Sequence, residues 1–377
     1  MNKAFLVILG IILVVMGGSA LLVFKQGDSA KPAASAQLGQ PLLKGLKASE
    51  IASITIREPK QTLTLAKKDE RWSVVEKNGF PADLEKVASL VVKAIELKAG
   101  QVEPIGEKDR TRLLLDEKGD GAATVLVFKA ADGKILAELL VGKKYFKKEP
   151  EGNASNATAD GRFVMLPADP KQMYTVADPL SQASASGSDW VSKAGFGMQG
   201  IRSLEVKPAE AGEGYRIERT SDGVDWLLDR VAAGQKLDAS RANAAAYSLH
   251  RVEIEDVAAP DADTGLDKPT TMIARTFDGL TYTLLAGKTE KEKTYVRIAL
   301  EGEPAREVKL GKEGEKAEDK EKREKAHAED MKALAERVAR EKLLKDHVLV
   351  VAASKLSDTL RKHSELLEQK KPDPAKK

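Results

Sequence analysis

The sequence predicts an α+β protein built as two tandem repeats of an antiparallel sheet with a packed helix, preceded by one transmembrane helix. Three observations predict it: an uncharged apolar run near the N-terminus, self-similarity at a shift of about 155 residues, and alternating apolar stretches joined by Asp-Gly turns. At 377 residues the chain exceeds the usual size of one hydrophobic core. Two domains are therefore expected.

The N-terminal element is an apolar segment, Ala4–Phe24, which contains no charged residue. Its length matches the roughly 20 residues that a helix needs to cross the hydrocarbon core of a bilayer. Gly18-Ser19-Ala20 resembles a signal-peptide cleavage site, so removal of the segment near Ala20 is the alternative. Because Leu21–Phe24 prolongs the apolar run beyond that site, the sequence favours a retained anchor over residues 1–25.

The predicted location follows from the anchor. The short end before Ala4 is expected to stay inside, which places the body on the extracytoplasmic side of a bacterial inner membrane as a single-pass protein. Residues 26–45 are rich in Ala, Ser, Lys, Gln and Pro, a composition typical of a flexible tether. The basic and acidic residues number 61 and 58, so the net charge of +3 indicates no nucleic-acid partner.

Each repeat is expected to begin with a strand followed by a tryptophan. Ile51–Ile56 and Ile201–Val206 both alternate apolar and polar side chains, the period of a half-buried strand. Trp72 and Trp226 follow them at similar distances. A carbohydrate-binding interpretation would select these two rings, but their equivalent places in the repeats favour a role in packing. We expect the first repeat over 46–190.

A helix comes next in each copy, and the two helices align without a gap. Asp83 and Asp238 stand where N-cap residues belong. Apolar residues then recur at helical spacing, which predicts one buried stripe per helix. The paired positions are Val87 with Ala242, Leu90 with Ala245, Val91 with Ala246, Ala94 with Leu249, and Leu97 with Val252.

The remaining repeated elements are strands and turns. Asp-Gly between apolar runs is a strong hairpin signal, and each copy has one. Each copy also has a Leu-Asp step before that hairpin and a Gly-Lys pair after it, which we interpret as the end of a strand. The matching pairs are Leu115-Asp116 with Leu266-Asp267, Asp132-Gly133 with Asp278-Gly279, and Gly142-Lys143 with Gly287-Lys288.

The second repeat, 191–377, contains a charged helical insertion at 311–346 between two strands that should be neighbours. Its first half, Lys312–Asp330, has almost no apolar residue and should be a solvated helix or disordered. In its second half the apolar residues recur at helical spacing, so this part is expected to pack on the domain or on a partner: Met331, Leu334, Ala335 and Val338. Packing on the domain is favoured. A last helix is expected from Lys355 to about Gln369.

No constellation of residues indicates a catalytic, cofactor or metal site, and we expect a protein that is not an enzyme. There are no cysteines, and the four histidines lack metal-ligand spacing. Gly195–Gly200 fits a dinucleotide fingerprint as a string, but a strand follows it where a helix is required, so a flexible joint between the repeats is favoured. A small basic cluster could meet anionic lipid or an acidic partner, although a solvated loop is favoured; its members are Lys143, Lys144, Lys147 and Lys148.

The pattern resembles the domain-of-unknown-function family numbered 4340. The residues that carry the resemblance are the Ile51–Ile56 strand, the following Trp, the Ala82-Asp83 helix start, the Gly265–Pro269 turn and the Gly-Lys pair, over most of 46–365. The resemblance implies a membrane-anchored accessory protein of an ABC-type export system and supplies no catalytic residues. The leading hypothesis is therefore a non-enzymatic accessory or scaffold protein with a protein partner in a transport complex. Binding of envelope polysaccharide or lipid is the alternative, and an envelope hydrolase is a third hypothesis.

Overall fold

The computed structural model describes residues 38–148, 158–210, 212–304 and 317–369. The predicted anchor over 1–25 and the part of the tether before residue 38 lie outside the described residues. Within the part of the chain that the structure describes, no helix is long and apolar enough to span a membrane. The prediction of an N-terminal anchor thus stays a prediction.

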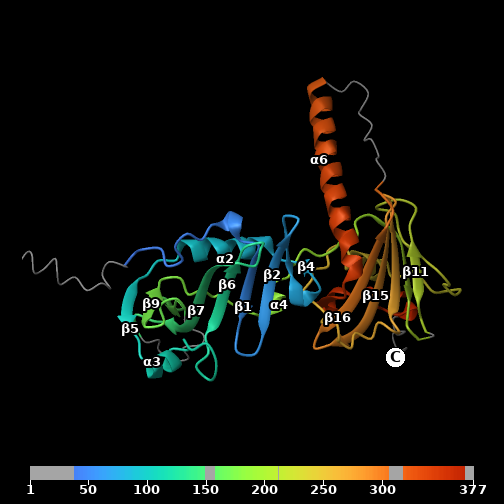
Figure 1. Ribbon diagram of the computed structural model, residues 1–377. Helices are drawn as coiled ribbons and strands as arrows, with labels where there is room; N and C mark the ends of the chain where they lie inside the picture. The colour runs from blue at the N-terminus through green and yellow to red at the C-terminus, as the bar shows by residue number, and fades with distance from the viewer. Residues whose placement is uncertain (1–37, 149–157, 211, 305–316, 370–377) are drawn as a thin grey trace, which may run out of the picture. The chain divides into compact units, whose positions relative to one another are not determined.

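The described chain divides into two compact units and forms two antiparallel sheets with few helices (Figure 1). The first unit comprises the described residues up to Trp72 together with Leu84–Ser186. The second comprises Ser73–Asp83 and the described residues from Gly187 onward. The predicted α+β class with antiparallel sheets is correct.

The sheet that contains the first strand has nine strands, in the order β4-β3-β2-β1-β6-β7-β8-β9-β5. The part of the chain that forms this sheet also contains the helices α2 (Leu84–Glu96) and α3 (Glu107–Arg112) and two short 3-10 turns, η2 (Ala48–Glu50) and η3 (Val75–Lys77). The strands are β1 (Ser53–Arg57), β2 (Thr62–Lys68), β3 (Arg71–Val74), β4 (Phe80–Pro81), β5 (Gln101–Pro104), β6 (Thr124–Lys129), β7 (Ile135–Tyr145), β8 (Gly161–Met165) and β9 (Gln172–Val176).

The other sheet has eight strands, in the order β12-β11-β10-β14-β15-β16-β17-β13. The strands are β10 (Ile201–Lys207), β11 (Tyr215–Glu218), β12 (Leu227–Leu228), β13 (Asp256–Val257), β14 (Thr270–Thr276), β15 (Thr281–Glu290), β16 (Lys293–Glu301) and β17 (Leu349–Ala352). The helices are α4 (Gly187–Trp190), α5 (Ala239–Tyr247) and α6 (Ala317–Lys342), with 3-10 turns η4 (Leu343–Asp346), η5 (Ala353–Lys355) and η6 (His363–Leu366).

The two sheets have the same topology. Without β4, the first order β3-β2-β1-β6-β7-β8-β9-β5 corresponds strand for strand to the second. The hairpins between β6 and β7 and between β14 and β15 turn at Asp132-Gly133 and Asp278-Gly279, as predicted. Gly133 and Gly279 have φ angles of 84° and 87°, the left-handed region that glycine enters without steric cost.

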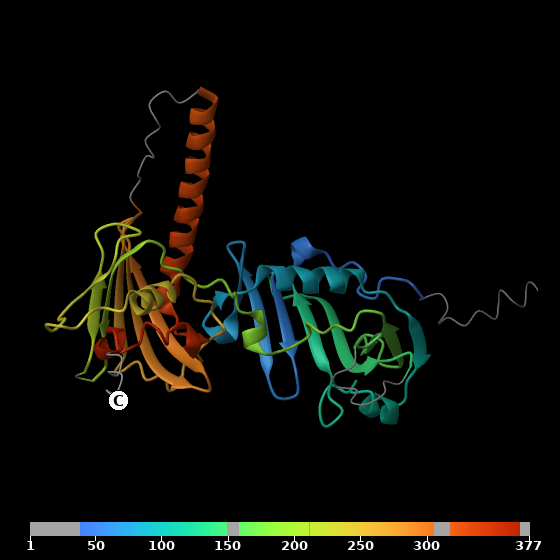
Figure 2. The same cartoon turned by 180° about the vertical axis from the view of Figure 1, so that it is seen from behind.

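The helices α2 and α5 occupy the predicted places. The Asp238 carboxylate caps α5 by accepting hydrogen bonds from the backbone N–H groups of Ser240 (3.0 Å) and Arg241 (3.2 Å). In α2 the buried residues recur at helical spacing, and Figure 2 shows this helix crossing the strands of the nine-stranded sheet. The buried residues are Val87, Leu90, Val91 and Ala94 in α2, and Ala242, Ala245 and Ala246 in α5.

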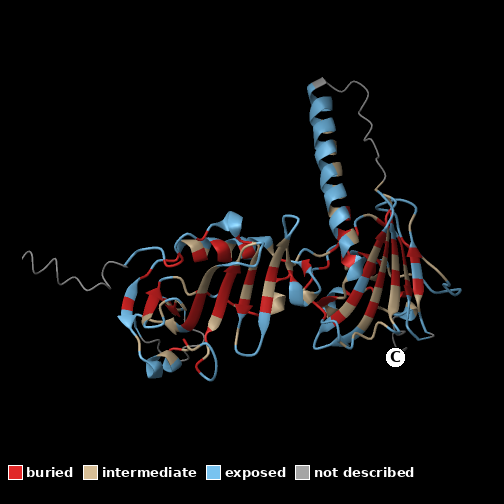
Figure 3. Cartoon of the chain, viewed as in Figure 1, coloured by how far each residue is buried: buried red, intermediate tan, exposed pale blue. Residues whose placement is uncertain are grey.

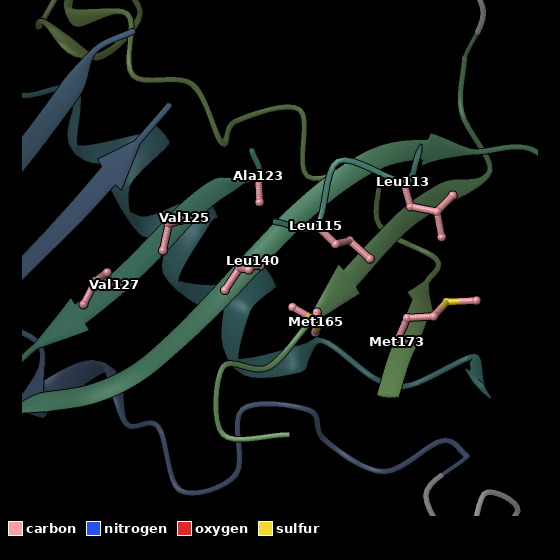
Figure 4. Packing of buried hydrophobic residues seen from close by; sticks show 8 residues of the cluster. All are labelled: Leu113, Leu115, Ala123, Val125, Val127, Leu140, Met165 and Met173. Carbon is pink, nitrogen blue, oxygen red and sulfur yellow. The ribbon is translucent and has the colours of Figure 1, made fainter. Parts of the chain in front are cut away.

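A second apolar layer in the first unit is formed by the segment between α3 and β6. Leu113 and Leu115 pack on side chains that β6, β7, β8 and β9 direct to one face of the sheet (Figure 4). The alternation of side chains along β6 puts Val125 and Val127 on this face. The full cluster is Leu113, Leu115, Ala123, Val125, Val127, Leu140, Met165 and Met173, with Ile105 and Phe163 against it.

The Gly-Lys pairs do not end their strands, contrary to the prediction. β7 continues to Tyr145 and β15 to Glu290, and in both the pairing register shifts at the Gly-Lys position, which marks a β-bulge. The Lys143 N–H donates to Leu113 O (2.9 Å), and the Lys288 N–H donates to Thr264 O (2.8 Å). Glycine is needed because a Cβ at this position would clash with the same carbonyl oxygen. Each Gly-Lys pair therefore marks the position at which the segment leading into the Leu-Asp pair crosses the strand.

The glycine-rich segment Gly195–Gly200 is not a free joint. Phe196 forms a two-way backbone bridge with Val252, with N···O distances of 3.1 and 2.9 Å. Gly195 and Gly197 lie so close to carbonyl oxygens of residues 250–252 that any Cβ would clash. The first unit has a corresponding antiparallel bridge between Pro41 and Lys98, in which the Leu42 N–H donates to Leu97 O (2.7 Å) and the Ala99 N–H donates to Gln40 O (3.2 Å). The segment is thus a repeated element, which the sequence comparison missed because the two copies share little besides glycine.

The predicted C-terminal helix from Lys355 to Gln369 is wrong. The chain there forms only the short turns η5 and η6 among its described residues. Its backbone groups bond to distant partners instead: His363 N donates to Glu213 O (2.8 Å), and Leu366 O accepts from Asp238 N (2.8 Å). Leu356 and Leu366 are fully buried. Tertiary hydrogen bonds thus replace the helical ones that the leucine spacing suggested.

Candidate functional site

The helix α6 interrupts the second sheet at the predicted insertion. It lies in sequence between β16 and β17, which nevertheless pair directly, Tyr295 opposite Val350. At 1.5 Å per residue, its 26 residues span about 39 Å. Figure 1 shows α6 standing away from the second sheet, and Figure 3 shows that most of its length is exposed.

The predicted apolar stripe lies on one face of α6, and its burial increases toward the C-terminal end. Met331 and Leu334 are half-buried, and Val338 is 5% exposed. Leu344 in the following turn η4 is also buried. The last turns of the helix therefore pack on their own domain, while Met331 and Leu334 remain partly accessible to another molecule.

A buried carboxylate fixes the base of α6. Glu341 is 1% exposed, and its side chain accepts hydrogen bonds from the Tyr282 hydroxyl (2.9 Å) and the Gly197 N–H (3.1 Å). Burial raises the pKa of Glu341 above its usual value, although Tyr282 and Arg337 oppose this change. The same desolvation, reinforced by Glu341, raises the pKa of Tyr282. The helix is therefore attached to β15 and to the glycine-rich segment by specific polar contacts.

A groove of about 630 Å³ runs beside the apolar stripe. Its walls include Pro304 at the end of the described β16 segment and the α6 residues Met331 and Val338. The complete lining is Glu303, Pro304, His327, Met331, Lys332, Ala335, Val338, Ala339 and Lys342. The lining of the groove therefore combines apolar and charged side chains.

The predicted lysine pair lies on β7 of the first unit and is separate in sequence and in unit from the α6 stripe. Lys143 is exposed, and its backbone N–H belongs to the β-bulge. Lys144 is half-buried and pairs across the strands with Arg162. Burial lowers the pKa of Arg162. The two lysines thus stand on a strand rather than on a loop.

Trp226 is 6% exposed and lies under a pocket of about 600 Å³ in the second unit. Its Nε1–H donates to the Asn243 side-chain oxygen (2.9 Å), and the Arg219 guanidinium lies 4.5 Å from the ring centroid. The packing interpretation of this tryptophan agrees with its burial. Sequence reasoning missed Tyr247 and His250, which also line the pocket, because an isolated aromatic on a helix carries no signal of its own.

Metal binding finds no support in the geometry of the described residues, since no group of three or more His, Asp or Glu side chains is placed to hold an ion. A further pocket lies between the base of α6 and the glycine-rich segment, and another lies beside the end of β10 and the loop that follows it. The arrangement therefore offers surfaces for binding, namely the α6 stripe and the Trp226 pocket.

The comparison with protein-family models finds one match, to the domain of unknown function DUF4340, over residues 72–269. That range covers more than half of the chain. The protein belongs to this family. The match begins at Trp72 and ends at Pro269, within the Leu-Asp turn of the second copy, so the family pattern crosses both units and is narrower than the resemblance over 46–365 suggested. No curated protein and no solved structure matches the chain.

Proposed function

We propose that this protein is a non-enzymatic, membrane-anchored accessory protein of an ABC-type transport system, with its body on the extracytoplasmic side. In this proposal α6 is the arm that contacts a subunit of the transporter. The observation that carries the proposal is a long helix fixed at its base by Glu341, with the apolar side chains of Met331 and Leu334 left partly accessible.

Two further features support an arm that binds a protein. A 26-residue helix that packs on its domain only near one end needs another reason for its length, because helices in water gain most of their stability from packing. Acidic and basic side chains are balanced along α6, so attraction to a polyanion does not account for it. Apolar contact along the stripe is the interaction that remains.

The test is site-specific photo-crosslinking of the full chain in native membranes. A photoreactive phenylalanine analogue at Met331 should crosslink to a permease subunit of an ABC-type system, identified by mass spectrometry. Ala333 provides the matched control: it is exposed, and two residues along a helix turn the side chain by about 200° to the opposite face. We expect far weaker crosslinking from position 333.

A functional variant sharpens the test. Leu334→Lys introduces a charge into the half-buried stripe and should reduce recovery of the transporter subunits, whereas Ala333→Lys should not. Equal crosslinking from both positions would show that contact is incidental. Recovery of proteins unrelated to transport, from Met331 alone, would overturn the proposed partner.

A further inference from the structure

The pocket over Trp226 is a second, independent candidate for binding. It lies within the second unit, between the start of β10, the loop after β11 and the exposed side of α5. Its volume of about 600 Å³ is in the range of about 300–1,000 Å³ that is usual for small-molecule sites. The complete lining is Met198, Gly200, Ile201, Arg219, Asp222, Trp226, Ser240, Asn243, Ala244, Ala246, Tyr247 and His250.

A comparison of the two repeats shows which residues of this pocket recur in the first unit and which occur only in the second. In both units a basic residue at the end of the second strand forms an ion pair with an acidic residue three positions later, shortly before the tryptophan. The pairs are Lys67–Glu70 (2.6 Å) and Arg219–Asp222 (2.7 Å). Because the arrangement recurs, it belongs to the scaffold.

The helix face is where the copies diverge. The gapless alignment of α2 with α5 places Asn243, Tyr247 and His250 where the first unit has Ala88, Val92 and Ile95. Three positions that are apolar in the first unit thus carry an amide and two aromatic rings in the second, and these three side chains line the pocket. Packing does not account for the change, because Tyr247 is 74% exposed and Asn243 and His250 are exposed as well.

The Tyr247 ring is supported by the His250 ring. The Tyr247 and His250 rings are stacked, with centroids 5.3 Å apart and planes inclined by 9°. Opposite charges in the pocket are already paired: the Arg219 guanidinium binds Asp222, donates from Nε to Ile201 O (2.9 Å) and covers Trp226. A phosphate would therefore find no free cation at Arg219. An uncharged ligand with an apolar face and several hydroxyl groups fits these groups better.

We propose that this pocket binds a neutral saccharide. The C–H face of a pyranose ring would stack on Tyr247, and its hydroxyl groups would donate to the Asp222 carboxylate and accept from the amide of Asn243. The inference does not depend on α6 or on the transport partner, so either proposal can fail while the other holds.

The experiment is a titration of the purified full chain with uncharged oligosaccharides, followed by calorimetry and by saturation-transfer NMR. The probes are N,N′-diacetylchitobiose, maltotriose and cellotriose, with adenosine monophosphate as the anionic comparison. The protein is held in a membrane mimetic without glycoside detergent, because a sugar head group would occupy the site. We expect saturable binding of at least one saccharide and none of the nucleotide.

Matched variants identify the site. Tyr247→Ala should raise the Kd about fivefold or more, and Tyr247→Phe should keep most of the affinity because the stacking face remains. Val92→Ala is the control at the equivalent exposed position of the first unit and should leave the Kd unchanged. Absence of saccharide binding by the wild-type protein, binding that Tyr247→Ala leaves intact, or tighter binding of the nucleotide would each overturn the proposal.

Discussion

Removing the Glu341 side chain should detach the base of α6. In Glu341→Ala the Tyr282 hydroxyl and the Gly197 N–H lose their acceptor. An unsatisfied buried donor costs about 1–3 kcal/mol, so two cost about 2–6 kcal/mol. Two effects reduce this loss: the desolvation of the carboxylate disappears, and the Tyr282 hydroxyl also lies 3.4 Å from Gly197 O, which can accept from it. We therefore expect a destabilisation of about 2 kcal/mol.

The assay is hydrogen exchange by mass spectrometry, supported by thermal unfolding. Peptides from the C-terminal half of α6 and from β15 should exchange faster in Glu341→Ala, and the melting temperature of the second unit should fall by about 4–8 °C. Glu336→Ala, on the exposed face of the same helix, is the control and should change stability by no more than about 0.5 kcal/mol. Identical exchange in the two variants would refute the reasoning.

The protonation of Glu341 gives the pH dependence of the same contact. Its pKa is raised in the folded state, so its favourable contribution is complete below the ordinary carboxyl pKa and is lost as the pH rises through the folded value. Glu341→Gln keeps an acceptor without the charge. The stability of this variant relative to wild type should therefore increase between acid and neutral pH, measured by urea unfolding. A relative stability that stays constant over this range would contradict the assignment.

Three further predictions concern other parts of the fold. Burial lowers the pKa of His347 in the folded state, so the contribution of this side chain to stability is present above the ordinary histidine pKa and is lost as the pH falls. His347→Phe should therefore flatten the decline of the urea midpoint between about pH 7 and 5. An unchanged slope would count against a role of His347 in this pH dependence. Gly142→Ala should destabilise the first unit by more than about 1 kcal/mol in chemical denaturation, because its Cβ would clash with Leu113 O. Gly106→Ala should cost less, because a Cβ there meets open space and only the N-cap preference of the short helix α3 is lost. Asp238→Ala should cost about 1 kcal/mol by loss of the α5 cap, and Asp238→Asn should recover most of it; equal melting temperatures for both variants would exclude the cap.

The repeated fold could be predicted from the sequence wherever a local pattern of residues indicated it. The alternation in Ile201–Val206, the Asp238 cap and the Asp278-Gly279 turn each depend on neighbours along the chain, and each appears in the structure close to its predicted place. The family could be predicted as well, because the resemblance depended on short local motifs, and the family model matches residues 72–269.

The candidate sites could be predicted from the sequence only in part. The spacing of Met331, Leu334 and Val338 indicated a helix face that packs, but it did not show that Val338 is buried while Met331 and Leu334 stay half-buried. Glu341 belonged, by sequence, to a charged run, and its burial depends on Tyr282 and on Gly197, which are far away in the chain. The pocket over Trp226 is similarly formed by residues of α5, of β10 and of the loop after β11.

The sequence by itself determined the repeated order of strand, strand and helix, the gapless match of the two helices, and the position of the insertion before β17, because these depend on side-chain spacing and on turn chemistry. Only the tertiary structure decided that Gly142 and Gly287 mark bulges, that Gly195–Gly200 is a bridged segment, and that the chain after Lys355 is not a helix. In each of these cases the backbone hydrogen bonds go to distant residues. Such bonds satisfy the same donors and acceptors as local ones, and the spacing of side chains does not reveal which partner the backbone takes.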